Sequence, residues 1–246
     1  MAHSVSDYND FALIYDRHWG PQYAAKALET LDSLVLPRIP TGGRVLDLCC
    51  GAGHISRVLA DRGFDVVGLD ASASLVEFAR KNAPTGHFEV ADAKSFSSSK
   101  HFHAVVSLND SLNHLLTIED LRAAFLNVYR CLVPGGVFLF DLNLAHKYQN
   151  SWAGSFSIVE EDAVCAVVAT RDMEEGLARF DAAVFLPVEG RWTRKDVRLL
   201  QTWYPPEDVC TTLVEVGFDD VRLTDRKGTP LTDHGIDKAF FTCTRN

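Results

Sequence analysis

Short apolar runs alternate with amphipathic helical stretches along the middle of this chain, and this alternation limits the possible folds more than any other feature. The strand-like runs are residues 44–48, 65–69, 87–90, 104–108 and 137–141. The helical stretches between them are residues 55–62, 75–82 and 118–132. Strands and helices that alternate at this spacing predict an α/β fold, with a parallel sheet and helices on both of its faces.

The flanking segments have different patterns. Residues 8–36 carry apolar side chains at helical spacing, and Gly20-Pro21 predicts a break between two helices. Residues 156–170, 178–187 and 197–204 are β-rich with no helix between them, which predicts an antiparallel insertion. A helix at 206–216 and strands at 221–224 and 238–244 follow. We therefore expect one domain over 1–246, made of an N-terminal helical cap (1–40), a ligand-binding core (41–142), the β-rich insertion (143–204) and a C-terminal part (205–246) that completes the sheet.

Composition excludes several classes of protein. The 246 residues are 47% hydrophobic, enough for one core, and the net charge is 24 − 33 = −9, which argues against nucleic acid as the main partner. No run of about 18 apolar residues and no signal-peptide pattern is found, so we expect a cytoplasmic protein that does not bind membranes. The six cysteines form no Cys-x-x-Cys pair or zinc-ligand cluster, which indicates buried thiols and no metal.

Two glycines follow an acidic residue where the first strand turns into a helix. Asp47 precedes Gly51 and Gly53, and glycines at such a turn let the backbone approach a ligand closely. The dinucleotide-binding pattern requires a third glycine, but Ser56 occupies that place. A carboxylate at the loop also suits a cationic ligand better than a pyrophosphate.

Acidic residues also follow the next two strands. Asp70 is placed to accept hydrogen bonds from both hydroxyls of a ribose. Asp92 is placed to accept one from an adenine amino group, although an aspartate at a strand end also commonly caps a turn.

Together these residues resemble the class I S-adenosylmethionine-dependent methyltransferases, in their small-molecule branch. Asp47, Gly51 and Gly53 match the first motif of that family, and Cys49 occupies the place of its first glycine. Residues 132–138, Leu-Val-Pro-Gly-Gly-Val-Phe, are similar to the turn that the family has before its fifth strand. The resemblance implies a Rossmann-like, mostly parallel sheet of seven strands.

The resemblance also implies which residues form the site. The cofactor-binding set is Tyr8, Asp47, Cys49, Gly51, Gly53, Asp70, Ala71, Ala91, Asp92, Ala93, Leu108, Asn109 and Asp110. Tyr15 and His114 are the candidate catalytic residues on the acceptor side, with Ser111 and Asn113 nearby. Two alternatives remain open: Tyr8, Tyr15 and Trp19 share a helical spacing that also suits core residues, and His114 also suits a helix cap.

The function implied is methyl transfer from S-adenosylmethionine to an N or O atom of a small molecule, with S-adenosylhomocysteine as the product. The alternatives are a non-catalytic protein that binds the nucleoside and, less favoured, a nicotinamide-dependent oxidoreductase. Residues 189–195 predict an exposed hairpin in which Trp192 or Arg194 could face the acceptor. A homodimer is possible.

Overall fold

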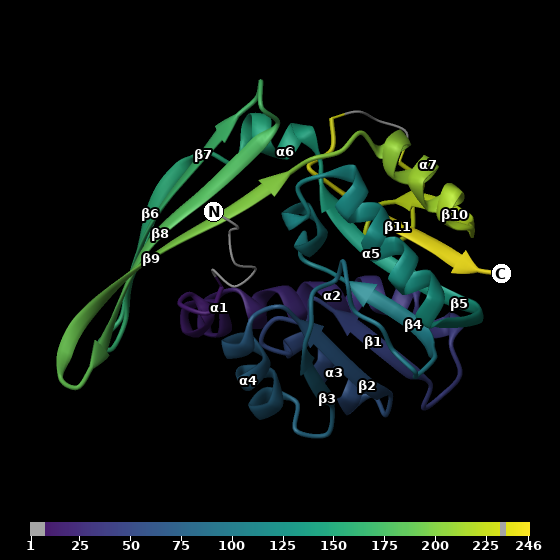
Figure 1. The fold of residues 1–246 in the computed structure, drawn as a ribbon, viewed down its shortest axis with the longest axis horizontal. Coiled ribbons are helices and arrows are strands. Elements are labelled where there is room, and N and C mark those ends of the chain that lie inside the picture. Colours follow the sequence, from purple (N-terminus) through teal and green to yellow (C-terminus); the bar gives the residue numbers. More distant parts are fainter. Residues whose placement is uncertain (1–7, 232–234) are drawn as a thin grey trace.

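Two β-sheets and the helices around them make up the computed structural model, which describes residues 8–231 and 235–246 (Figure 1). The helices are α1 (Ala12–His18), α2 (Gly20–Leu34), α3 (His54–Asp61), α4 (Ala73–Asn82), α5 (Ile118–Cys131), α6 (Ala145–Asn150) and α7 (Pro206–Val216), with 3₁₀ turns η1 (Leu36–Arg38) and η2 (Ser111–His114). The strands are β1 (Arg44–Leu48), β2 (Asp65–Asp70), β3 (His87–Val90), β4 (Phe102–Ser107), β5 (Leu132–Asn143), β6 (Gly154–Val159), β7 (Val164–Asp172), β8 (Leu177–Val188), β9 (Arg191–Thr202), β10 (Phe218–Thr224) and β11 (Lys238–Arg245).

The larger sheet has seven strands in the order β10-β11-β5-β4-β1-β2-β3. Strands β1 to β5 pair in parallel, whereas β11 runs antiparallel to both β5 and β10. One apolar cluster lies on the face covered by α5 and α7, and another on the face covered by α2 and α3. The Rossmann-like prediction is therefore confirmed, and the carboxyl ends of the parallel strands meet at one edge.

The smaller sheet is the β-rich insertion, in which β6, β7, β8 and β9 pair antiparallel in that order. It projects from the body as a long arm (Figure 1). Its inner face forms an apolar cluster with Phe11 and Ile14 of the N-terminal segment. The β-rich segment 156–170 contains parts of two strands, β6 and β7, because the chain turns between them and the Glu160 N–H donates to the carbonyl of Ala163 at 2.8 Å.

Three further local predictions need correction. Tyr8 precedes α1 instead of lying on it, and Trp19 joins α1 to α2. Pro134-Gly135-Gly136 is a bulge inside β5, where the register passes from Phe102–Leu132 to Ala104–Val137. The six-residue helix α6 was not expected, because its sequence has no apolar periodicity.

Candidate active site

A cavity of about 580 Å³ opens at the carboxyl ends of the parallel strands. Its volume is typical of a small-molecule site. The N-terminal segment and the antiparallel sheet complete its walls. The predicted site residues that line it are Tyr8, Tyr15, Cys49, Gly51, Asp70, Ala71, Ala91, Asp92, Ala93, Asn109, Asp110 and His114.

Three predicted residues do not line this cavity. Asp47 is buried in β1, where its carboxylate accepts a hydrogen bond of 2.6 Å from the Ser56 hydroxyl. Gly53 faces α4, because a Cβ there would lie 2.7 Å from the Cα of Ala79. Leu108 is buried in the apolar cluster beneath the site. These three residues lie behind the cavity wall, and their role in cofactor binding stays a prediction.

Asp70 fixes the conformation of the loop after β1. One carboxylate oxygen of Asp70 accepts the Gly51 N–H at 2.8 Å, and the other accepts the Ser72 N–H at 2.9 Å. Burial raises the pKa of Asp70, and these backbone donors oppose that shift. Each carboxylate oxygen has a second lone pair, so Asp70 can still accept ribose hydroxyls from the cavity.

Gly51 has a left-handed backbone, with φ at 54°. A Cβ at this position would lie 3.0 Å from the ring of Tyr15. The loop and the N-terminal segment therefore approach each other too closely for a side chain, and Tyr15 lies against the predicted cofactor loop.

A further part of the cavity wall is formed by the residues that follow β3. Asp92 and its neighbours Ala91 and Ala93 line the cavity together with Lys94. One Asp92 oxygen accepts the Lys94 N–H at 2.8 Å, so this aspartate caps its own turn. Small alanine side chains on both sides leave space for a flat group such as a nucleobase.

A hydrogen-bonded group surrounds His114. Its Nδ1 lies 2.7 Å from the carbonyl oxygen of Leu200, which can only accept, so Nδ1 carries the proton. Its Nε2 is then the acceptor for the Tyr8 hydroxyl at 2.9 Å and lies 3.2 Å from the side-chain nitrogen of Gln201. Burial lowers the pKa of His114, so the ring is neutral at pH 7 and its Nε2 lone pair faces the Tyr8 hydroxyl.

A buried ionic cluster stands beside this histidine. Lys238 donates to Asp110 at 2.9 Å and also to Asp141. Asp110 accepts a further hydrogen bond of 2.8 Å from Gln201, which connects the cluster to His114. Burial lowers the pKa of Lys238, but the two carboxylates raise it by more, so its charge is retained. Asp110 and Asp141 therefore share the one ammonium group of Lys238.

Side-chain hydrogen bonds hold the N-terminal segment over the cavity. Asn9 accepts hydrogen bonds from the Ser72 hydroxyl at 2.7 Å and from the Ser74 N–H at 3.1 Å. Asp16 lies 2.8 Å from His54 Nε2 and accepts from Asn82 at 2.7 Å. These contacts could not be predicted from sequence, because each joins residues far apart in the chain.

Two acceptor-side predictions are not supported by this arrangement. Asn113 is buried and ties β5 to β9, since its amide donates to the carbonyls of Asn143 at 3.0 Å and Thr202 at 2.7 Å. Trp192 lies at a second hollow near the tip of the arm, and Arg194, which lines neither hollow, pairs with Asp196 at 2.7 Å. Ser111 does line the main cavity, although its hydroxyl donates to a backbone carbonyl.

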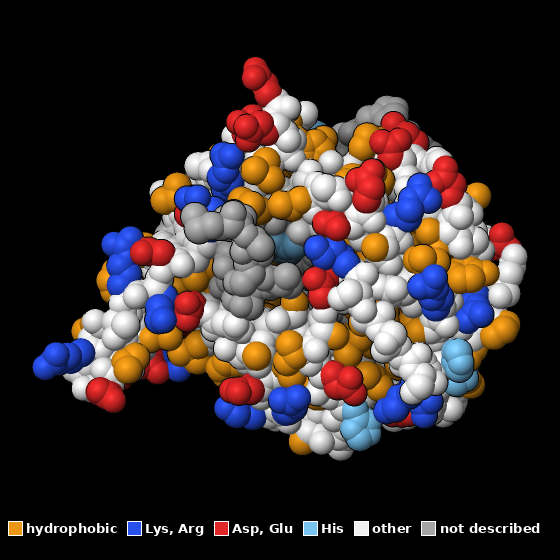
Figure 2. Space-filling model, viewed as in Figure 1, with side chains coloured by type: hydrophobic (Ala, Val, Ile, Leu, Met, Phe, Trp, Pro, Cys, Tyr) orange, Lys and Arg blue, Asp and Glu red, His pale blue; other side chains and the backbone are white. Residues whose placement is uncertain are grey.

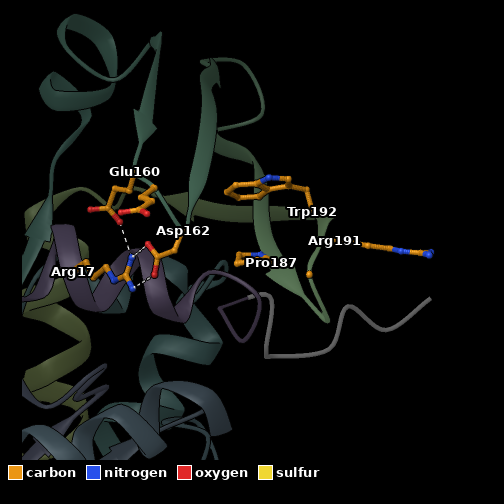
Figure 3. A pocket seen from close by; sticks show the side chains of 8 residues that line it. Arg17, Glu160, Asp162, Pro187, Arg191 and Trp192 are labelled. Carbon is orange, nitrogen blue, oxygen red and sulfur yellow. Dashed lines mark hydrogen bonds and ion pairs between the residues drawn. The ribbon is translucent and has the colours of Figure 1, made fainter.

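The second hollow contains an ionic contact between α1 and the arm. Arg17 pairs with Glu160 and Asp162, both at 2.7 Å, while Trp192 and Arg191 lie apart from this group (Figure 3). Since the Arg17 guanidinium pairs with both carboxylates, the contact fastens the N-terminal segment to the turn between β6 and β7.

Comparison with known proteins agrees with this geometry. A methyltransferase-domain family model matches residues 45–136. The Bacillus subtilis protein YqeM, which carries the name of a methyltransferase, is 31% identical over 225 residues, covering 88% of this chain and 88% of YqeM. A Streptomyces venezuelae dTDP-3-amino-3,4,6-trideoxy-alpha-D-glucopyranose N,N-dimethyltransferase is 30% identical over 206 residues, covering 80% of this chain and 86% of that enzyme.

A solved structure shares the whole fold. The S-adenosylmethionine-dependent methyltransferase from Clostridium acetobutylicum aligns with a TM-score of 0.80 at 19% identity, over 97% of this chain and 99% of that chain. This chain belongs to the S-adenosylmethionine-dependent methyltransferase family. It is an enzyme that uses S-adenosylmethionine to methylate a small-molecule acceptor.

Residues 8–231 and 235–246 lack two features that would suggest other functions. No helix there is long and apolar enough to cross a membrane. Within the same ranges, no three or more His, Cys, Asp or Glu side chains are grouped so that they could hold a metal ion.

Proposed function

We propose that this enzyme methylates an amine nitrogen, and that the twelve predicted residues lining the cavity hold the cofactor and the acceptor. The observation that carries the proposal is the position of the Asp110 carboxylate beside the neutral ring of His114, both on the cavity wall. A carboxylate attracts an ammonium ion, and a neutral imidazole can take its proton. The relative named as an N,N-dimethyltransferase supports the same choice of atom.

S-adenosylmethionine fits the opposite half of the cavity. It supplies a methyl group bonded to a positively charged sulfur. Asp70 offers lone pairs to the ribose hydroxyls, and the alanines beside Asp92 leave room for the adenine. Tyr15 lies over Gly51, where its ring face can contact the sulfonium.

The chain's own residues then prepare the nucleophile. The acceptor nitrogen must lose a proton, because its lone pair forms the new bond to carbon while the carbon–sulfur pair returns to sulfur. The Tyr8 hydroxyl donates to His114 Nε2, so the acceptor's proton passes to the Tyr8 oxygen while the Tyr8 proton moves to Nε2, and Gln201 lies against the same nitrogen. A homodimer and a cytoplasmic location stay predictions from the sequence.

Paired acceptors test the choice of atom. A set of primary amines, each matched by the alcohol of the same carbon skeleton, is incubated with the enzyme and S-adenosylmethionine labelled with deuterium in its methyl group. We expect labelled product from amines only, with tandem mass spectrometry locating the label on nitrogen. Label on hydroxyl oxygen alone would overturn the proposal.

A further inference from the structure

The acceptor half of the cavity has an aromatic wall, formed by Phe11, Trp19, Phe156 and Phe180. These side chains come from the N-terminal segment and from the inner face of the antiparallel sheet. Their ring centroids lie close together, at 5.3 Å for Phe11 and Trp19, 5.6 Å for Phe11 and Phe180, and 6.1 Å for Trp19 and Phe156. Phe156 keeps 46% of its surface exposed, so the wall presents an open aromatic face to a ligand.

The cations at the cavity are mostly neutralised by carboxylates. Arg198 pairs with Asp181 at 2.6 Å. Lys94 lies 3.6 Å from Asp120. Lys238, behind the wall, pairs with two carboxylates. Among lining residues in the described part of the chain, Lys147 alone is a cation with no carboxylate within 4 Å.

This charge arrangement does not suit a phosphorylated acceptor. A diphosphate needs several unpaired donors, commonly arginines in bidentate contact. The cavity offers one unpaired lysine, Lys147, and its wall also carries the carboxyl group of Asp110. On the face shown in Figure 2, the coloured Lys and Arg side chains are interspersed with Asp and Glu, so they form no continuous basic surface there.

We propose that the acceptor is an amine carried on a hydrophobic, ring-containing body without phosphate. This inference rests on the proposed methylation of nitrogen and adds the class of molecule. The ring packs against the aromatic wall, which places the amine toward Asp110 and His114. The predicted acceptor therefore differs from the nucleotide-linked sugar in the name of the Streptomyces venezuelae relative.

Calorimetric binding to the protein saturated with S-adenosylhomocysteine tests this inference without any methyl transfer. The probes are ethylamine, 2-phenylethylamine, 2-(1-naphthyl)ethylamine and thymidine 5′-diphosphate. We expect affinity to rise at least tenfold from ethylamine to the naphthyl compound, and thymidine diphosphate to bind more weakly than the naphthyl compound. Equal affinity for the three amines, or tighter binding of thymidine diphosphate, would overturn the inference.

Variants locate the binding surface. Because Phe156 is half exposed, Phe156→Ala should fold normally and weaken binding of the naphthyl compound about tenfold. Phe185→Ala is the matched control, since Phe185 lies on β8, outside the cavity lining, and should leave affinity unchanged. Equal affinity in Phe156→Ala and wild type would contradict the aromatic wall as the acceptor site. Binding of thymidine diphosphate that is lost in Lys147→Ala would contradict it as well. The paired-acceptor experiment separately reports whether nitrogen is the methylated atom, so the two failures can be told apart.

Discussion

Asp70 has two tasks at the scale of single residues, because it orders the loop after β1 and faces the cavity. Asp70→Ala should weaken binding of S-adenosylhomocysteine by about 1.5–3 kcal/mol, the range for hydrogen bonds to a charged group. Titration calorimetry measures this loss. Asp65→Ala, at the other end of the same strand, is the control, since Asp65 pairs with Arg44 far from the cavity. Wild-type affinity in Asp70→Ala would refute this assignment.

His114 and Tyr15 should affect turnover more than cofactor binding. We expect His114→Ala to lower kcat by roughly 10²–10⁴-fold, the usual range for a lost general base. Tyr15→Phe should also lower kcat, because it removes a hydroxyl from the cavity. Steady-state kinetics with an amine acceptor and calorimetry with S-adenosylhomocysteine separate the two effects. His101→Ala, which changes an exposed histidine, is the control. Wild-type turnover in both variants would mean that His114 and Tyr15 contribute only to packing.

Asp47 should make stability depend on pH. Burial raises its pKa to about 7, while hydrogen bonds from Ser56 oppose the shift. An unfolded aspartate has a pKa of about 3.9, so the folded state binds the extra proton between these values, and its contribution to stability is lost as pH rises from about 4 to about 7. The slope approaches about 1.4 kcal/mol per pH unit.

The isosteric variant Asp47→Asn removes this titration. Urea unfolding of both proteins at pH 5 and pH 8 should show the variant gaining stability relative to wild type at the higher pH. A difference in unfolding free energy that does not change between these two pH values would mean that Asp47 is ionised throughout.

At the scale of elements, Gly53 matters because α4 packs directly against its turn. Gly53→Ala should lower the free energy of unfolding, since φ is 77° and the new Cβ would lie 2.7 Å from the Ala79 Cα. Gly42→Ala is a matched control, with φ at 69° and no atom nearer than 3.8 Å. Thermal or urea unfolding should show a loss for Gly53→Ala that exceeds the loss for Gly42→Ala by at least about 1 kcal/mol. Equal losses in the two variants would mean that backbone strain alone, and not contact with α4, makes Gly53→Ala unfavourable.

The elements were largely predictable because strands buried on both faces produce continuous apolar runs. The acidic residues after β2 and β3 were also predictable as cavity residues, since parallel strands bring their carboxyl ends to one edge. Asp47 was misplaced because sequence does not reveal that its side chain turns toward Ser56 on α3. Gln201 and Lys238 were missed for a related reason: their contacts to Asp110 cross 91 and 128 positions of the chain.

At the scale of the whole molecule, three separate parts must meet to form the site. The strand ends of the larger sheet supply Asp70 and Asp92, the N-terminal segment supplies Tyr8 and Tyr15, and the antiparallel sheet supplies Gln201. The inner face of the arm packs on the N-terminal segment, so the acceptor wall and the cover of the cofactor site share one apolar cluster. This arrangement places the methyl donor and the acceptor in one cavity.

A crystal structure of the complex with S-adenosylhomocysteine tests this account most directly. We predict that the ribose hydroxyls lie within hydrogen-bond distance of Asp70 and that the adenine lies between Ala91 and Ala93. The sulfur should face Tyr15 and His114. Electron density for the nucleoside outside this cavity, or inside it with Asp70 making no contact to the ribose, would contradict the account.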